Sequence, residues 1–340
     1  MGKGNLTLIS HARETLMTTA ATKADSSNGN NQLVVGLCTY KRRISLERLL
    51  KNVALSAHHT IYKITIIVVD NDGSDPEVAK SIQQFTADSG VPTRYRIETV
   101  PGISAARNAV FDEAYAIGAH FMAMIDDDEW PPPNWLAALL RTQAATNAVV
   151  VGAPVHPVFP AQAKKLEKYA RYWSVEKQFL NGKPFVFCTC NFLIDLRAIE
   201  NESRPLFDDA FGLSGGGDTV FFRKLFFAGY AMAWAEPAWI YEEVPPSRAS
   251  FSWMRARRFR VGNHAVRWES VDGGTRRSLA KTIGLTLRLL VYPAWRREPE
   301  SPLVGWLLEF DKVRGRWASH CGELFVEYAR PLAPGEKICR

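Results

Sequence analysis

Residues 121–133 read Phe-Met-Ala-Met-Ile-Asp-Asp-Asp-Glu-Trp-Pro-Pro-Pro, so an apolar run passes directly into four acidic residues and a proline turn. The apolar run predicts a strand buried on both faces, as in a parallel sheet. Four carboxylates at the end of such a strand destabilise the folded chain unless a positive partner neutralises them. A divalent cation such as Mg²⁺ or Mn²⁺, shared with the phosphate oxygens of a ligand, is the simplest partner. The alternative is an acidic loop fully exposed to water.

Strand and helix patterns alternate on both sides of this segment. The alternation predicts an α/β fold, with a mostly parallel sheet flanked by helices and joined by right-handed crossovers. The expected strands are 33–38, 64–69, 94–100 and 121–125, and the expected helices are 45–57, capped by Ser45, 104–117, closed by Gly118, and 219–227.

Polar clusters follow three of these strands, at 39–43, 70–75 and 126–129. Ligands of parallel sheets bind at the carboxyl ends of the strands. We therefore expect the three clusters to share one rim of the sheet and to form the site there.

Two glycine-containing stretches add candidate site residues. The helix start at 102–108, Gly-Ile-Ser-Ala-Ala-Arg-Asn, has small residues that permit close approach and an Arg107 one turn in, although packing alone also explains it. The stretch 207–219 carries three consecutive glycines before Asp218. The glycines favour a ligand that approaches the backbone closely. Asp218 is either a helix cap or a general base.

Composition restricts the class of protein. The chain has 340 residues, of which 46% are hydrophobic and 23% charged, so it can bury a large core and is not mostly disordered. It contains no apolar stretch of the length that a membrane-spanning helix needs. Residues 1–31 are polar, which predicts a flexible tail and no secretory signal. We therefore expect a cytosolic protein.

The formal net charge of +7 is concentrated near the C-terminus, because 248–316 contains fifteen Lys or Arg and six Asp or Glu. Such a balance favours a surface for anionic lipid headgroups, with aromatic rings at the boundary. Nucleic acid could attract the same charge, and a plain solvated basic face is the third interpretation. The interleaved apolar residues are Trp253, Trp268, Leu285, Leu287, Leu289, Leu290, Val291, Trp295 and Trp306.

The five cysteines are too few and too scattered for a disulfide scaffold, which suggests a reducing compartment. Cys188 and Cys190 form one Cys-x-Cys with no second pair, so a zinc site is not expected. We predict that these two residues share one face of a strand.

Five motifs occur in an order that resembles the family 2 inverting glycosyltransferases of the GT-A fold. The resemblance is closest to the bacterial exopolysaccharide branch, the succinoglycan-type β-glucosyltransferases, and it covers roughly residues 33–262. A sixth element, Val-Pro-Pro-Ser-Arg at 244–248, matches that branch. The five motifs are Thr-Tyr-Lys-Arg at 39–42, the acidic strand end at 70–72, the helix start at 102–108, Asp-Asp-Asp-Glu at 126–129 and Gly-Gly-Gly-Asp-Thr at 215–219.

The resemblance implies a GT-A nucleotide-diphospho-sugar transferase domain at 32–245 and a basic, Trp-rich helical extension at 246–340. The extension would bind the acceptor or an anionic membrane surface. The implied reaction transfers a hexose from a nucleotide-diphosphate sugar to a polyprenyl-diphosphate-linked saccharide, with inversion at the anomeric carbon. UDP-glucose is the first candidate for the donor, and the implied process is surface polysaccharide synthesis. The implied cofactor is Mn²⁺ or Mg²⁺, and the implied location is cytoplasmic, peripheral on the inner face of the cell membrane.

The resemblance also implies a role for each matching residue. Asp218 would be the catalytic base, and Asp126 and Asp128 would hold the metal. Two positions depart from the usual pattern: Gly217 stands where relatives have Glu, and Asn71 where many have Asp. The implied donor contacts are Thr39, Tyr40, Arg42, Asp70, Asn71, Asp72, Gly102, Ser104, Arg107, Asp126 and Asp127. The implied acceptor contacts are Gly216, Gly217, Arg248 and His264.

Three other functions fit less of the sequence. A nucleotidyltransferase acting on a sugar phosphate needs a glycine-rich phosphate loop after the first strand, and 39–42 has no glycine. A dinucleotide-dependent oxidoreductase needs Gly-x-Gly-x-x-Gly there. A nucleic-acid-binding protein explains the basic C-terminal part but leaves the acidic cluster without a purpose. Nucleic acid is therefore not the expected partner.

Overall fold

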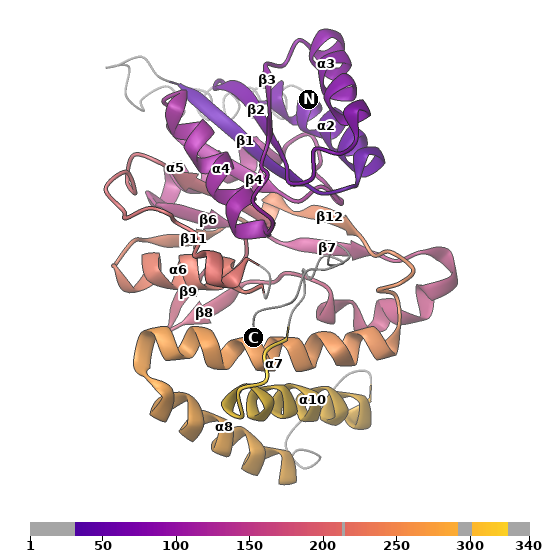
Figure 1. Ribbon diagram of the computed structural model, residues 1–340, viewed down its shortest axis with the longest axis vertical. Helices are drawn as coiled ribbons and strands as arrows, with labels where there is room; N and C mark the ends of the chain where they lie inside the picture. The colour runs from indigo at the N-terminus through magenta and orange to yellow at the C-terminus, as the bar shows by residue number, and fades with distance from the viewer. Residues whose placement is uncertain (1–30, 213–214, 292–300, 326–340) are drawn as a thin grey trace, which may run out of the picture. The chain divides into compact units, whose positions relative to one another are not determined.

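The computed structural model describes residues 31–212, 215–291 and 301–325. The predicted tail at 1–31 lies almost wholly outside the described residues, and Gln32 begins one compact unit that continues into the C-terminal helices. Its central sheet has seven strands in the order β11-β6-β10-β4-β1-β2-β3 (Figure 1). The strands are β1 (Gln32–Thr39), β2 (Lys63–Asp70), β3 (Thr93–Ile97), β4 (Phe121–Ile125), β6 (Val150–Gly152), β10 (Asn191–Asp195) and β11 (Met232–Trp234).

The prediction of a mostly parallel sheet is confirmed. β1 pairs in parallel with β2 and β4, β2 with β3, and β11 with β6, whereas β10 runs antiparallel between β4 and β6. In this register Thr39 lies beside Asp70, so the first two polar clusters leave the sheet at the same edge. The strand expected at 94–100 is shorter, because β3 ends at Ile97.

Helices cover both faces of the sheet. The core on one face is built from β1, β2 and β4 with α2 (Arg43–Ala57), α3 (Pro76–Ser89) and α5 (Trp135–Thr146). The core on the other face involves α4 (Ile103–Ala116) and α6 (Gly217–Phe227). A side chain at Gly36 in β1 would collide with Val110 of α4, so this glycine allows the helix to pack closely on the sheet.

A smaller sheet extends the rim beyond the end of β4. It has the order β5-β12-β7, formed by β5 (Glu129–Trp130), β12 (Ile240–Glu243) and β7 (Val155–Val158). β12 pairs antiparallel with β5, which sets Glu242 opposite Glu129. The acidic cluster is thus held between two sheets. A separate hairpin joins β8 (Gln178–Leu180) to β9 (Lys183–Phe185), and short 3₁₀ segments occur at η2 (Ala161–Tyr172), η3 (Asp209–Phe211) and η4 (Glu236–Ala238).

In the C-terminal part the described residues form three helices, α7 (Phe251–Gly273), α8 (Thr275–Leu290) and α10 (Pro302–His320). α7 packs against α10 so closely that a side chain at Gly262 or Gly315 would overlap the backbone of the other helix. Ion pairs join α7 to α10, because the buried Asp311 of α10 meets Arg255 of α7 and the buried Arg316 of α10 meets Glu269 of α7. Arg316 also donates to the carbonyl of Ser278, which attaches α8. Among the described residues, no helix is long and apolar enough to cross a membrane.

Three local expectations need correction, and one is confirmed. α2 begins at Arg43, so Ser45 lies inside the helix and is not its cap. α6 begins at Gly217 with Gly216 in a left-handed conformation at its cap position, so Asp218 is not the cap either. The expected closure of α4 by Gly118 is confirmed, because the helix ends at Ala116 with Ile117 at the cap position and Gly118 follows in a left-handed conformation with a φ of 66°.

The third correction concerns Cys188 and Cys190, which do not lie on a strand. They occupy the bend between β9 and β10, where their sulfur atoms are 2.9 Å apart.

Candidate active site

The acidic turn after β4 meets the loop after β1, as expected from the parallel pairing of the two strands. The Thr39 hydroxyl donates to Oδ2 of Asp127 over 2.8 Å. Arg42 donates from Nη1 to Oδ1 of Asp127 over 2.9 Å and to Oδ2 of Asp128 over 2.7 Å. One guanidinium thus bridges two of the carboxylates and fixes how the turn presents them.

The carboxylates of this turn are short of positive charge. Burial raises the pKa of Asp126 to about 6, with Arg107 opposing the rise and Asp128, Asp127 and Asp218 adding to it. Burial also raises the pKa of Asp127, although Arg42 lowers it. These shifts mean that removing the negative charges from water is only partly offset by the arginines. An added cation would therefore be stabilised here.

A further acid, Glu242 of β12, joins the cluster and was not predicted from the sequence. Burial and the charge of Asp128 raise the pKa of Glu242 to about 7. Arg248 lies between the two carboxylates, with Nη1 3.9 Å from Oδ2 of Asp128 and 4.0 Å from Oε1 of Glu242. The adjacent acids 242–243 directly before Val-Pro-Pro-Ser-Arg were the available signal. Only the pairing of β12 with β5 gives Glu242 its place.

Glu129, the last acid of the turn, supports the other three. Its side chain is buried, and Oε2 accepts a hydrogen bond of 2.8 Å from the backbone N–H of Asp126. Burial raises the pKa of Glu129 well above its usual value. We conclude that Glu129 fixes the backbone of the turn, while Asp126, Asp127 and Asp128 are the candidates for contact with a ligand.

Of the three polar residues in the loop after β2, two hold the loop by hydrogen bonds and the third faces a basic side chain. Asp70 accepts hydrogen bonds from the backbone N–H of Asp72 and the hydroxyl of Tyr95. The amide of Asn71 donates to the carbonyls of Glu98 and Val100 and accepts from Gly102. Both ends of the Asn71 amide thus tie the loop that leads to α4, and Asp72 is the acid of this loop that faces Lys41, 3.6 Å away.

The helix start at 102–108 holds the segment that leads to Asp218. Ser104 donates to the carbonyl of Asp208 over 3.0 Å, and Ile103 N–H donates to the carbonyl of Gly212 over 3.3 Å. Asn108 donates to the Phe207 carbonyl over 2.8 Å and accepts from the Phe207 N–H over 2.9 Å. These bonds attach 207–212 to α4, a role for this motif that the sequence did not predict.

Gly102 has a φ of 120°, a conformation that favours glycine. A side chain there would also press against the backbone of Gly212, 3.2 Å away. This glycine therefore lets α4 lie directly against the segment before the glycine loop.

Asp218 lies in the first turn of α6, where its Oδ1 accepts from the N–H of Thr219 over 2.8 Å. It is close enough to Asp126 to raise the pKa of that residue. A Cβ at Gly216 would lie 3.6 Å from Nδ1 of His264, which places α7 directly beside this turn. Burial, followed by the charge of Arg260, lowers the pKa of His264 to about 4, so its imidazole is neutral at physiological pH.

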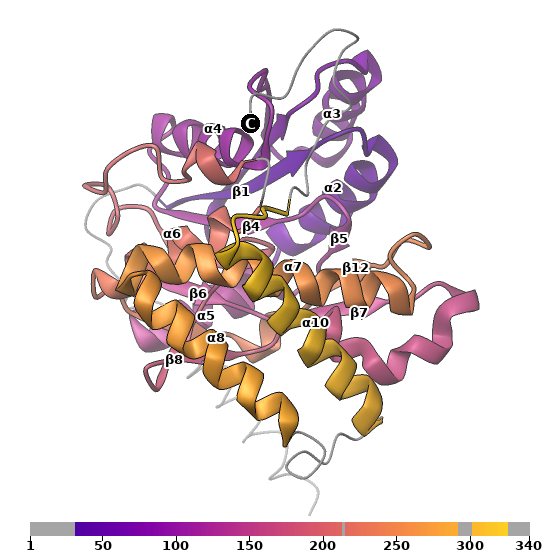
Figure 2. The same cartoon turned by 60° about the horizontal axis from the view of Figure 1, so that its bottom comes forward.

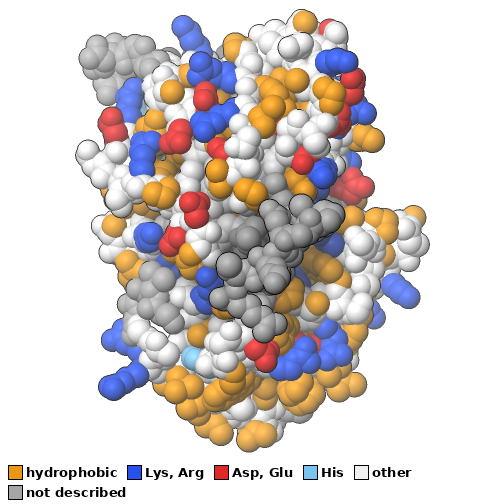
Figure 3. All heavy atoms as spheres, viewed as in Figure 1, with side chains coloured by type: hydrophobic (Ala, Val, Ile, Leu, Met, Phe, Trp, Pro, Cys, Tyr) orange, Lys and Arg blue, Asp and Glu red, His pale blue; other side chains and the backbone are white. Residues whose placement is uncertain are grey.

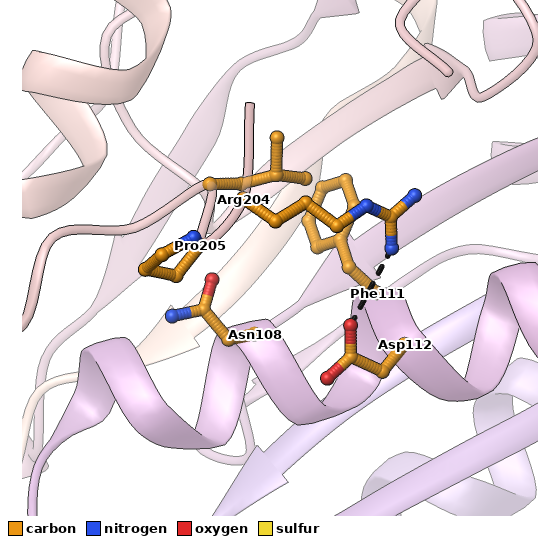
Figure 4. Close-up of a pocket in the computed structure, with 6 residues that line it drawn as sticks. Asn108, Phe111, Asp112, Arg204 and Pro205 are labelled. Atoms are coloured by element: carbon orange, nitrogen blue, oxygen red, sulfur yellow. Dashed lines mark hydrogen bonds and ion pairs between the residues drawn. The ribbon is translucent and has the colours of Figure 1, made fainter. Parts of the chain in front are cut away.

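A separate pocket of about 250 Å³ lies beside α4 (Figure 4). At its edge the side chains of Arg204 and Asp112 meet at 3.5 Å. The acidic turn contributes no residue to it. The lining residues are Asn108, Phe111, Asp112, Arg204, Pro205 and Leu206.

The structure therefore brings most of the predicted site residues to one rim. Thr39, Arg42 and Arg248 contact the acidic turn directly, and Asp218 and His264 lie across from it on α6 and α7. Within the described residues, no three His, Cys, Asp or Glu side chains converge closely enough to hold a metal ion unaided. Tyr40 is more than one-third exposed at the loop after β1.

Known proteins resemble this chain in sequence and in fold. The Glycosyl transferase family 2 model matches residues 34–202. The succinoglycan biosynthesis protein ExoM of Rhizobium meliloti (strain 1021) is 32% identical over 228 residues, which cover 67% of this chain and 72% of ExoM.

Two solved structures align along most of the chain. The mannosyltransferase PcManGT from Pyrobaculum calidifontis, solved with GDP-Man and Mn²⁺, has a TM-score of 0.55 at 14% identity, covering 91% of this chain and 94% of that chain. TarS 1–349 of S. aureus, solved with UDP, has a TM-score of 0.48 at 14% identity, covering 90% and 95%. The fold is that of the GT-A glycosyltransferases, and the match to ExoM over most of both sequences shows that the chain belongs to glycosyltransferase family 2.

Proposed function

We propose that this glycosyltransferase moves a hexose from a nucleotide-diphosphate sugar, with UDP-glucose as the first candidate, to a lipid-linked oligosaccharide, and that it inverts the anomeric centre. The observation that carries the proposal is the under-neutralised acidic turn 126–128 facing Asp218 across the rim. A cluster of this kind suits a ligand that arrives with a cation, and a lone carboxylate opposite suits a hydroxyl nucleophile.

A divalent cation, Mn²⁺ or Mg²⁺, fits the residues of the turn. The carboxylates of Asp126 and Asp128 would hold it, because Asp128 lies beside Arg42 and Arg248 at the rim and its charge adds to the burial that raises the pKa of Asp126. Because the described residues offer too few ligands on their own, the diphosphate of the donor would supply the rest. When bound, the cation stabilises the negative charge that develops on the departing nucleoside diphosphate.

Asp218 would be the base that activates the acceptor. The acceptor hydroxyl oxygen forms a bond to the anomeric carbon while the bond from that carbon to the diphosphate breaks, and the hydroxyl proton passes to the Asp218 carboxylate. Attack opposite to the leaving group inverts the anomeric centre, so an α-linked donor gives a β-glycoside. The hydrogen bond from Thr219 N–H to Asp218 supports this role, because it fixes the orientation of the carboxylate that must accept the proton.

The donor nucleoside would lie at the loops after β1 and β2, with Thr39, Tyr40 and Asp70–Asp72 around the base and ribose. Among these residues we choose Asp72 as the side chain that meets the ligand. Both ends of the Asn71 amide are already bonded to the backbone, whereas the Asp72 carboxylate faces Lys41. Gly102, Ser104 and Arg107 would border the sugar diphosphate. Arg107 supports this, because its charge acts on Asp126 from the α4 side.

The acceptor would approach from α6 and α7, past Gly216, Gly217, Arg248 and His264. The neutral His264 would offer a hydrogen bond and not a positive charge. ExoM is a succinoglycan biosynthesis protein, which supports a role for this chain in exopolysaccharide synthesis. We propose that the acceptor is a saccharide on polyprenyl diphosphate, and that the enzyme works in the cytoplasm on the inner face of the cell membrane.

The variant Asp218→Asn tests the proposal. We expect it to bind a nucleotide sugar with Mn²⁺ as the parent does, but to transfer the sugar about 10²–10⁴-fold more slowly, because the base is lost. Calorimetry measures binding, and release of nucleoside diphosphate measures transfer. The control is Asp209→Asn, an exposed carboxylate in η3. Full activity of Asp218→Asn would reject the base, and release of pyrophosphate from a nucleoside triphosphate and a sugar phosphate would favour a nucleotidyltransferase.

A further inference from the structure

Two C-terminal helices leave apolar side chains uncovered along their outer sides. On α8, Leu279, Ile283, Leu287 and Leu290 recur at helical spacing and are all exposed, with Leu287 at 59% and Leu290 at 78%. On α10, Leu303, Phe310 and Trp317 recur every seven residues and are also exposed. We name these seven residues the α8–α10 face.

The two stripes belong to one surface. Trp306 of α10 donates from its indole N–H to the Leu289 carbonyl over 3.1 Å, and Trp317 donates to the Thr286 hydroxyl over 3.0 Å. These bonds hold α8 and α10 side by side, and Figure 2 shows the two helices together at the front of the view. In Figure 3 hydrophobic side chains gather at the lower edge, where Figure 1 places α8 and α10. Scattered exposed leucines are common, but a continuous surface of this kind marks an interaction site.

The charge around the α8–α10 face is predominantly positive. α8 contains no Asp or Glu, and its Arg276, Arg277 and Arg288 are exposed. The two acids of α10 turn away from this face, because Asp311 pairs with Arg255 and Glu309 with Arg258, both on α7. An apolar stripe bordered by arginines complements a layer with an apolar interior and negative headgroups.

We propose that the α8–α10 face binds the headgroup region of an anionic lipid bilayer, with its apolar side chains inserted and its arginines on the phosphates. This inference rests on the proposed lipid-linked acceptor, for which it supplies the surface. The sequence predicted such a surface for the whole basic stretch 248–316, which includes Leu287 and Leu290. We restrict it to α8 and α10, because α7 lies between the catalytic core and α10 (Figure 1), with its Trp253 stacked on Trp173 at 5.5 Å.

α7 connects this surface to the active site. Arg255 and Arg258 point to α10, whereas His264 lies beside Gly216 and Arg257 acts on the Glu242 carboxylate. Packed helix axes are about 8–10 Å apart, so one helix layer separates the proposed membrane surface from the rim. A saccharide anchored in the bilayer by a diphosphate would thus need to extend only a short way to reach Asp218.

The double variant Leu287→Glu/Leu290→Glu tests the surface in the full-length protein. Both side chains are exposed, so the change should leave folding intact, which circular dichroism checks. We expect at least about tenfold weaker binding to phosphatidylcholine vesicles containing phosphatidylglycerol, because two inserted side chains are lost. The matched control is Ile61→Glu, which changes an apolar side chain of 77% exposure remote in sequence from these helices and should bind like the parent.

Two further arms decide between lipid and other partners. Parent binding should fall in high salt and in vesicles without phosphatidylglycerol, and Arg276→Glu/Arg277→Glu should reproduce that fall. Equal vesicle binding by parent and double variant would overturn the proposal. So would a concentration-dependent dimer that the double variant abolishes in sedimentation velocity without lipid, since a second copy would then cover the face. No donor or acceptor is used, so vesicle binding can fail while glycosyl transfer stands.

Discussion

The acidic rim and the α8–α10 face depart from ordinary protein surfaces in opposite ways. At the rim, charged groups are buried: Asp126, Asp127 and Glu129 lie at the end of a core strand, and burial raises the pKa of each. On the α8–α10 face, large apolar groups are exposed beside arginines. Each arrangement is unfavourable in water alone. We propose that a ligand relieves each of them, a cation with a diphosphate at the rim and a lipid surface on the α8–α10 face.

The largest effect is expected when a charge is removed from the rim. Asp128→Asn should lower glycosyl transfer about 10²–10³-fold, because the developing charge on the leaving group loses its metal-mediated stabilisation. Chelation of divalent cations should have a similar effect on the parent. Steady-state kinetics across a Mn²⁺ titration measures both.

The matched control for that change is Asp88→Asn, an exposed carboxylate on α3. It should keep the activity and the Mn²⁺ dependence of the parent. A parent that transfers sugar equally well with and without divalent cation would remove the metal from the mechanism.

The next change weakens the contacts that attach α8 to α7 and α10 without altering the exposed side of α8. Glu269 accepts hydrogen bonds from Arg316, Lys281 and Ser278, which outweigh burial and lower the pKa of Glu269 to about 2. Glu269→Gln should cost about 3 kcal/mol of the free energy of unfolding, because Arg316 stays buried with a weaker partner. Urea unfolding measures the cost, with the exposed Glu167→Gln as control.

The pH dependence of this pair has a defined sign. The pKa of Glu269 is lower in the folded protein than its ordinary 4.5, so its contribution is fully present above about pH 4.5 and is lost as the pH falls toward 2. The difference in stability between Glu269→Gln and the parent should therefore shrink with acidification. A difference that stays constant from neutral pH to pH 3 would contradict the ion pair.

The smallest expected effect concerns the hydrogen bonds that connect the two sides of the rim. Asn108→Ala removes both hydrogen bonds that the Asn108 side chain makes to the backbone of Phe207, and it should destabilise the protein by about 1–3 kcal/mol. Since Asn108 anchors the segment before Asp218, kcat should fall while the donor KM stays near that of the parent. Asp112→Ala, one turn along α4, is the control, because its pairing with Arg204 is exposed. Loss of donor binding in Asn108→Ala would instead place this residue in the donor site.

Sequence patterns were sufficient where a local signal coincided with the tertiary role. The runs 33–38, 64–69 and 121–125 are β-branched or apolar throughout, and they form the parallel strands that bring Thr39, Asp70 and Asp126 to one edge. The resemblance implied roles for Asp218 and Asp126 in one site, and the charge of Asp218 acts on Asp126 in the structure.

Other features depend on contacts between residues far apart in the chain, which no local pattern encodes. Glu242 joins the site only because β12 pairs with β5, a contact between segments more than a hundred residues apart. Asn108 contacts Phe207 across ninety-nine residues of chain. The whole basic stretch 248–316 was expected to form a lipid surface, but the close packing of α10 on α7 places the α7 part of it between two layers.

The amino-acid sequence by itself determined the four strands β4-β1-β2-β3 of the sheet, the family and the acidic turn, because strand burial and a run of carboxylates are properties of adjacent residues. Only the tertiary structure decided which charges are compensated and which apolar side chains stay uncovered. Those properties depend on what packs against each residue: Arg42 and Arg248 on the turn, α7 between the core and α10, and no described segment over Leu287 and Leu290.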